Sequence, residues 1–110
     1  MKRLVILFLL AAIAAVPMTF ITLPDITGTG AVVTLSTNAI RVQWVQIISD
    51  STNAAAMRFG ECSVVSATRG LKIAAGGGYN TPVVLADPYV LSQLCLYVAN
   101  GDKAYVAYGN

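Results

Sequence analysis

Alternation of apolar and polar residues is clearest in the last part of the sequence. Residues 92–108 read SQLCLYVANGDKAYVAY, two alternating, aromatic-rich runs separated by Asn100-Gly101. Both residues of that dipeptide tolerate a positive φ, which a type I′ turn requires at its two central positions. The pattern predicts a β-hairpin in which Tyr97 lies opposite Ala104 and diagonal to Tyr105.

Before the hairpin, from residue 31 on, short β-type runs alternate with turn clusters roughly every eight to twelve residues, a spacing typical of all-β domains. In the longest run, residues 39–48, the apolar parity switches after Trp44, which indicates a bulge or burial of both faces. The expected fold is a compact β-sandwich or jelly-roll-like barrel of about seven strands over residues 31–110. The runs before the hairpin are residues 31–35, 39–48, 54–59, 62–67, 71–74 and 81–85.

The start of the chain has a different pattern. Lys2 and Arg3 precede an uninterrupted apolar run over residues 4–16, and Ala12-Ile13-Ala14 offers a cleavage site of the A-x-A type. The pattern predicts an apolar helix over residues 1–23, and three roles fit it. It is a secretory signal peptide, a retained anchor in which residues 4–23 contact the membrane over ~30 Å, or an apolar tail buried in an assembly.

Two glycine-rich stretches interrupt the pattern. Residues 24–30 (PDITGTG) are a linker by composition, and the Gly28-Thr29-Gly30 stretch lacks the helix and third glycine of a dinucleotide-binding motif. Residues 76–78 are three glycines, but the lysine and hydroxyl residue of a phosphate-binding loop do not follow them. We interpret both stretches as flexible connections.

Composition narrows the classes of partner. The 110 residues fit one domain, with 56% apolar and only 11% charged residues. Two of the seven basic residues are Lys2 and Arg3, which leaves five basic against five acidic residues in the body. Such a body lacks the basic stripe that nucleic acids require, so we expect no nucleic-acid partner. It also lacks the self-repulsion that keeps proteins apart, which favours self-association.

Cys62 and Cys95 are the only two cysteines. In an oxidising compartment they would form one disulfide and close a loop of about thirty residues, worth roughly 3–4 kcal/mol. Alternatively they are two buried thiols, since Cys95 lies within an alternating run between Leu94 and Leu96. No cysteine spacing of a zinc or redox site is present.

Candidate catalytic groups are few. The sequence contains no histidine, which removes Ser-His-Asp and Cys-His catalysis and the commonest metal ligand. Each carboxylate lies in or beside a turn, where turn chemistry explains it without catalysis. We therefore expect no catalytic, cofactor-binding or metal-binding residues, no cofactor and no enzymatic activity. The five carboxylates are Asp25, Asp50, Glu61, Asp87 and Asp102.

Three residues are candidates for an interface. Tyr97 and Tyr105 are aromatic side chains of the predicted hairpin, suited to stacking on sugars, to a subunit contact or to the half-buried face of a sheet. Arg69 follows Thr68 and precedes Gly70, and its guanidinium would hydrogen-bond carbonyls of its own loop or reach a neighbouring subunit.

Three segments of the body carry a recognisable pattern: RVQWVQI at residues 41–47, MRFGECSVVSATRGLKIAAGGG at 57–78 and YVLSQLCLYVANGDKAYVAYG at 89–109. In these segments the chain resembles small virion-associated β-proteins of tailed bacteriophages. The resemblance implies a structural role as a capsid-decoration, fibre or spike module, usually oligomeric, without catalytic residues. The apolar leader departs from that family and suits an exported protein or a virion with a lipid or hydrophobic inner layer.

We therefore expect a non-enzymatic virion structural protein that binds itself and other coat or fibre subunits. The alternative is an exported bacterial surface or periplasmic β-domain, such as an adhesin or fibre subunit that binds a glycan or a protein. The virion is the expected location in the first case, and the periplasm, the cell surface or the medium in the second.

Overall fold

The structure, a computed structural model, describes residues 20–84 and 89–109. These ranges contain eleven short strands in antiparallel pairs and one helix, the single-turn 3-10 helix η1 (Leu91–Gln93). The all-β prediction is confirmed, but about seven strands was too low. Residues 20–22, 26–27, 78–80 and 89–90 also form strands, although they lie outside the predicted runs. In addition, the run at residues 39–48 breaks at Gln43 into two strands.

The larger sheet has five strands. Four of them follow the order β1-β11-β5-β8, and β2 pairs with β11 beyond β1. β11 is the longest strand of the fold and pairs with three others. The strands are β1 (Phe20–Thr22), β2 (Ile26–Thr27), β5 (Trp44–Ser49), β8 (Gly78–Asn80) and β11 (Lys103–Gly109).

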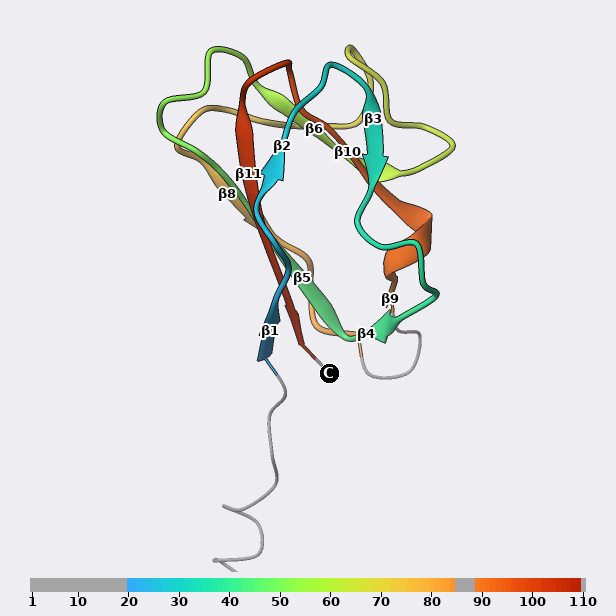
Figure 1. The fold of residues 1–110 in the computed structure, drawn as a ribbon. Coiled ribbons are helices and arrows are strands. Elements are labelled where there is room, and N and C mark those ends of the chain that lie inside the picture. Colours follow the sequence, from blue (N-terminus) through green and yellow to red (C-terminus); the bar gives the residue numbers. More distant parts are fainter. Residues whose placement is uncertain (1–19, 85–88, 110) are drawn as a thin grey trace, which may run out of the picture.

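A second sheet has four strands in the order β3-β10-β6-β7, and a third is the pair β4-β9. In Figure 1, β1, β2 and β11 lie on the left of the view, and β3, β10 and β9 lie on the right. The strands are β3 (Val32–Thr34), β6 (Met57–Glu61), β7 (Leu71–Ile73), β10 (Leu94–Tyr97), β4 (Arg41–Val42) and β9 (Tyr89–Val90).

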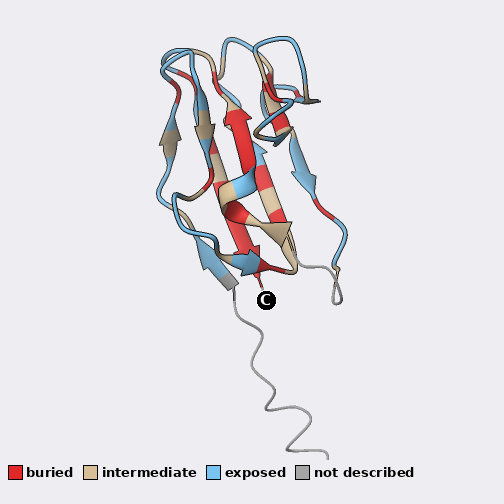
Figure 2. Cartoon of the chain, turned by 90° about the vertical axis from the view of Figure 1, so that its right-hand side faces the viewer, coloured by how far each residue is buried: buried red, intermediate tan, exposed pale blue. Residues whose placement is uncertain are grey.

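One hydrophobic core receives side chains from both larger sheets. Val45 and Ile47 of β5 and Leu96 of β10 are fully buried in the same cluster, each contributing about 1.5–3 kcal/mol. Figure 2 shows the buried positions along the central strands and the exposed ones on the outer strands and loops. At one side of the core, Tyr79 of β8 contacts Phe59 of β6, with ring centroids 6.1 Å apart.

The predicted hairpin over residues 92–108 is wrong. β10 pairs with β3 and β6, whereas β11 pairs with β1, β2 and β5, so the two runs belong to different sheets. Asp102 N donates to Ala99 O at 3.0 Å, and in this turn only Gly101 has a positive φ, 86°. A single positive φ at the third turn position is the type II geometry, which does not favour the pairing of a tight hairpin.

A bent ribbon instead connects the two sheets: residues 20–35 run antiparallel to residues 94–109 along its whole length. Phe20 is opposite Gly109 in the larger sheet, and Thr34 is opposite Cys95 in the second sheet. Between the two sheets, both segments of the ribbon bend together, one at residues 28–30 and the other at residues 98–102. There Gly101 N donates to Gly28 O at 3.0 Å.

This ribbon corrects the expectations for the start of the domain. Residues 20–22, expected in the apolar helix, form β1, because β-branched Ile21 and Thr22 suit a strand and the edge of β11 is available to them. Residues 24–30 are not a free linker either. Ile26–Thr27 form β2, and Gly28 packs so closely that a Cβ there would lie 2.1 Å from Ala99 O. Residues 1–19 lie outside the described ranges, and with them most of the predicted helix and membrane contact at 4–23.

Two other segments differ from the predictions. Residues 62–67 form hydrogen-bonded turns, with Val65 N bonded to Glu61 O at 3.1 Å, instead of a strand. Residues 81–84 follow the edge of β5 through two hydrogen bonds but are not a strand, since Pro82 has no N–H to donate. The regular edge strand is β8, which begins within the glycine-rich stretch at residues 76–78.

Candidate functional site

A row of four side chains crosses the outward face of the larger sheet. The registers place Thr22, Ala107, Gln46 and Asn80 side by side on β1, β11, β5 and β8. Because Val45 and Ile47 face the core, the alternate residue Gln46 and its direct partners face outward. We call these four residues the amide row.

Two shallow hollows meet on the amide row, at Gln46. One has a volume of about 340 Å³ and extends over β11 towards β1 and the residues after it. The other has a volume of about 350 Å³ and extends over β8. The first is lined by Thr22, Leu23, Asp25, Gln46, Ile48, Tyr105, Val106 and Ala107, and the second by Trp44, Gln46, Asn80, Thr81 and Val83.

Aromatic side chains flank the amide row on both sides. Tyr105 lies two residues before Ala107 on β11, so both face outward. It is directly opposite Ile48, which is 41% exposed. Trp44 lies two residues before Gln46 on β5, on the same face of the sheet, and is opposite Gly109. A Cβ at Gly109 would lie 2.3 Å from the Trp44 indole nitrogen, so the indole ring lies directly over the glycine backbone. Only glycine at this position leaves room for the ring.

Asp50 holds the Tyr105 ring in place from the next loop. The Tyr105 hydroxyl donates to Asp50 Oδ2, while Asp50 Oδ1 accepts from the Thr52 N–H at 2.8 Å and the Thr52 hydroxyl at 2.6 Å. The Thr52 hydroxyl, then Tyr105, then the Thr52 N–H lower the pKa of Asp50 from 3.8 to about 2. The hydrogen bond to Asp50 in turn raises the pKa of Tyr105 above 10.0.

These two shifts have a chemical consequence. A general acid or base works best with a pKa near the operating pH. Here the pKa of Asp50 falls and the pKa of Tyr105 rises, so at neutral pH the first stays ionised and the second stays protonated. At neutral pH the hydrogen bond between them therefore orients the Tyr105 ring.

The loop at residues 49–55 is fixed to β11 by two further polar side chains. The Asn53 amide donates to Lys103 O at 2.8 Å and accepts from Lys103 N at 2.7 Å, as a neighbouring strand would. The buried Asp102 carboxylate, 7% exposed, accepts from Ala54 N at 3.0 Å and Ala55 N at 3.1 Å. These bonds make the loop a rigid support for Asp50.

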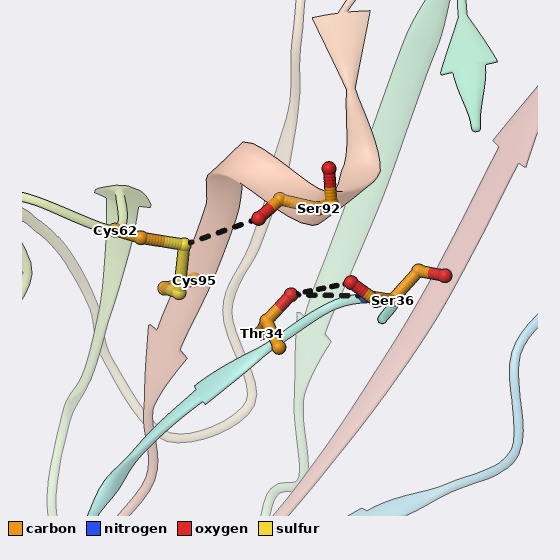
Figure 3. The surroundings of a disulfide bond; sticks show 5 residues. All are labelled: Thr34, Ser36, Cys62, Ser92 and Cys95. Carbon is orange, nitrogen blue, oxygen red and sulfur yellow. Dashed lines mark hydrogen bonds between the residues drawn. A yellow bond between two sulfur atoms is a disulfide. The ribbon is translucent and has the colours of Figure 1, made fainter. Parts of the chain in front are cut away.

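The disulfide lies in the other sheet. Cys62 and Cys95 are joined, with Cα atoms 4.8 Å apart, and connect the residue after β6 to the middle of β10. The Cys62 sulfur of this bond lies 3.8 Å from Ser92 O. Figure 3 shows this pair on one side of β10, with Thr34 and Ser36 on the other side. A hollow of about 350 Å³ beside the bond is lined by Glu61, Cys62, Ser63, Ser92 and Gln93.

The structure does not bring the three predicted interface residues together. Tyr97 is half-buried on β10, between Val32 and Arg58, and Tyr105 lies on the other sheet. The expected diagonal contact between the two tyrosines was wrong, because it depended on the hairpin. Arg69 is exposed, and its main chain closes a loop with Ser66 through bonds of 3.0 and 3.4 Å. Interface roles for these residues remain predictions.

The turn interpretation of the carboxylates fits those in the described ranges to different degrees. Asp50 accepts from Thr52 two residues on, as a turn aspartate does, and Asp102 closes the turn at residues 99–102. Asp25 is exposed and lines the first hollow. Asp87 lies outside the described residues. Within residues 20–84 and 89–109, no three Cys, Asp or Glu side chains are grouped as metal ligands would be.

Sequence reasoning missed the amide row and its flanking rings. Gln46 and Asn80 are 34 positions apart, and only the β5–β8 register makes them neighbours. The alternation around Gln46 carried a partial signal, since it separates Val45 and Ile47 from their outward neighbours. The partner strand was missed because β8 begins in the glycine-rich stretch.

The fold and the face together define an all-β domain with two larger antiparallel sheets, one of them presenting a neutral, aromatic-flanked row. Comparison of the chain with protein-family models, with curated proteins and with solved structures gave no match. Of the described residues, none belongs to a helix of the length and apolarity that crossing a bilayer requires.

Proposed function

We propose that this chain is a non-enzymatic structural module that assembles with copies of itself, or with other coat or fibre subunits, through the edges of its sheets. The proposal places it in a virion, as a capsid-decoration, fibre or spike component. The observation that carries it is the exposure of a large apolar side chain on four edge strands of the two larger sheets. The resemblance to phage virion proteins in the sequence supports the same role.

The four edge residues are Ile21 on β1, Val32 on β3, Leu71 on β7 and Tyr79 on β8, with exposed fractions of 40%, 40%, 44% and 36%. An edge strand presents unpaired N–H and C=O groups, and proteins that stay monomeric usually protect it with charge or proline. Lys72 of β7 is the one charged residue within these four strands. Such edges favour the addition of strands from another chain.

A finer architecture belongs to the same proposal. The two larger sheets would form the two layers of a β-sandwich or jelly-roll-like barrel, since one buried cluster contains residues of β5 and β11 together with residues of β6 and β10. In a sandwich each layer ends in open edges, which is where the assembly contacts are proposed.

The non-enzymatic part of the proposal is supported by the directions of the pKa shifts of Asp50 and Tyr105. The Asp50–Tyr105 pair is shifted away from neutrality, and the sequence offers no histidine to replace it as a base.

A second candidate function is an exported bacterial surface or periplasmic domain. The Cys62–Cys95 disulfide favours it, because such bonds persist in oxidising compartments and the apolar leader suits export. Intact mass separates the two candidates. A native protein that begins at Ala15 favours the exported domain, whereas one that begins at Met1 and copurifies with particles favours the virion component.

Edge contacts are testable by charge insertion in the full chain. We expect the native protein to sediment as an oligomer, and Val32→Lys or Leu71→Lys to shift it towards the monomer, because a charge at an edge opposes strand addition. Val64→Lys is the matched control, since Val64 is 45% exposed but lies in a turn and belongs to none of the strands. A native monomer at all concentrations, or equal effects of all three variants, would exclude assembly through the edges.

A further inference from the structure

We propose that the outward face of β1, β11, β5 and β8 binds a linear, neutral oligosaccharide along the amide row. Tyr105 is the stacking surface, and the amides of Gln46 and Asn80 hydrogen-bond the sugar hydroxyls. This binding role is separate from assembly through the edges and uses different residues.

The chemistry of the row matches hydroxyl groups. A carboxamide both donates and accepts hydrogen bonds, and so does each hydroxyl of a sugar. Gln46 and Asn80 are direct cross-strand partners, so their amides lie close enough to hold adjacent hydroxyls. Thr22 adds a hydroxyl at the other end of the row, and the small side chain of Ala107 leaves a depression between Thr22 and Gln46.

The ring beside the row is held before any ligand arrives. A sugar ring has an apolar face of C–H groups, which packs on an aromatic side chain. The hydroxyl of Tyr105 is bonded to Asp50, and Asp50 is itself held by Thr52. Fixing a contact residue in advance reduces the entropy lost on binding. Asp50 therefore acts as a positioning residue for the Tyr105 ring.

Charge and size favour an oligosaccharide over a protein partner. Among the described residues that line the two hollows, Asp25 alone carries a charge, and it lies in the same hollow as Tyr105. The candidate face spans four strands and three rows of outward side chains, namely the amide row and the rows of Tyr105 and Trp44 beside it. At ordinary strand spacings this face covers roughly 200 Å², well below the ~800 Å² per partner of a stable protein interface. Hollows of about 340 and 350 Å³ are instead in the range of small-ligand sites.

The single tryptophan provides the measurement. Trp44 lines the second hollow, so its fluorescence reports on a ligand that lies along the row. The full-length chain is titrated with cellohexaose, maltohexaose and N-acetylchitohexaose, each up to ~10 mM, which detects affinities as weak as about 1 mM. At least one of the three is expected to give a saturable change in intensity or emission maximum.

Variants then locate the site. Gln46→Ala with Asn80→Ala is expected to weaken binding about tenfold or more, since it removes the hydrogen bonds of both amides to the sugar. Tyr105→Phe keeps the ring and is expected to weaken binding less than Tyr105→Leu does. Gln93→Ala is the matched control, because Gln93 is an exposed amide in the hollow beside the disulfide.

Three results would overturn the proposal: no saturable change with any of the three sugars, equal weakening by the Gln93 and Gln46/Asn80 variants, or a change of oligomeric mass in the Gln46/Asn80 variant. The last result would make this face a protein contact. If the proposal of assembly through the edges is wrong, the sedimentation of the Val32 and Leu71 variants will show it, and the sugar titration followed by Trp44 fluorescence will be unaffected. The two proposals therefore fail separately.

Discussion

Two segments that follow consecutive strands, β5 and β6, in different sheets are held in opposite ways. In the second sheet, a covalent bond between Cys62 and Cys95 joins the end of β6 to β10. In the larger sheet, the loop at residues 49–55 is held to β11 by polar side chains, with Asn53 and Asp102 bonded to main-chain groups. The first attachment depends on redox conditions and the second on hydrogen bonds made by an amide and a carboxylate.

The difference indicates which part of the molecule each condition would loosen. A reductant acts on the second sheet and leaves the polar attachments of the larger sheet intact. Acid acts on the larger sheet, where it protonates Asp50 and removes the support of the Tyr105 ring. The proposed sugar-binding face is therefore expected to respond to acid more than to reductant.

The largest effect is expected from removing the covalent bond. Cys62→Ala with Cys95→Ala opens a connection that spans a sequence separation of 33 residues. We expect a loss of about 3–4 kcal/mol in the free energy of unfolding, because the unfolded chain regains loop entropy. Urea titration of the variant beside the native chain measures it. A loss below about 1 kcal/mol would show that the bond adds little to hydrogen-bonded strands.

The next effect is expected at Asp102. Asp102→Ala leaves the N–H groups of Ala54 and Ala55 without their acceptor, and we expect a loss of about 2–3 kcal/mol by urea titration. Asp102→Asn keeps one acceptor oxygen and should lose less. Glu61→Ala, which removes an exposed carboxylate, serves as the control. If the two alanine variants lose the same amount, the attachment of the 49–55 loop does not depend on Asp102.

The smallest effect is a pH dependence from Asp50. Its pKa of about 2 in the folded chain lies below the ordinary 3.8. Ionised Asp50 therefore stabilises the fold above about pH 4, and this contribution is lost as the pH falls from about 4 towards 2. We expect the melting temperature of the native chain to fall more steeply over this window than that of Asp50→Asn. Parallel slopes, with Asp25→Asn as the control for lost charge, would contradict the role of Asp50.

The strands at the two ends of the fold show what the sequence can and cannot predict. Alternation correctly located β10 and β11, since Leu94 and Leu96 of one and Ala104 and Val106 of the other belong to the core cluster. The same alternation fits two arrangements of these strands. In a hairpin they pair in one sheet with their apolar faces side by side, and in an arch they lie in two sheets with their apolar faces opposed across a core. The choice depends on residues 26–34, which pair with both strands, and no local pattern reports that pairing.

The candidate face was less predictable than the fold for a related reason. Tyr105 was identified from the sequence, but its contact with Asp50 spans 55 positions. Gln46 and Asn80 carry no motif, and they become a site only through strand register. Local chemistry, such as the turn bonds of Asp50 with Thr52, was within reach because it depends on residues two positions apart.

The bent ribbon also determines when this chain can fold. Phe20 pairs with Gly109 and Thr34 with Cys95. The strands at the start of the domain, β1 and β3, therefore cannot join their sheets until β11 and β10 have been synthesised. During synthesis, residues 20–84 would wait for β10 and β11 to leave the ribosome, since these strands are interior members of the two larger sheets. Pairings between such distant residues also slow folding, because a long loop must close before they form. Folding of this domain therefore follows its translation instead of accompanying it.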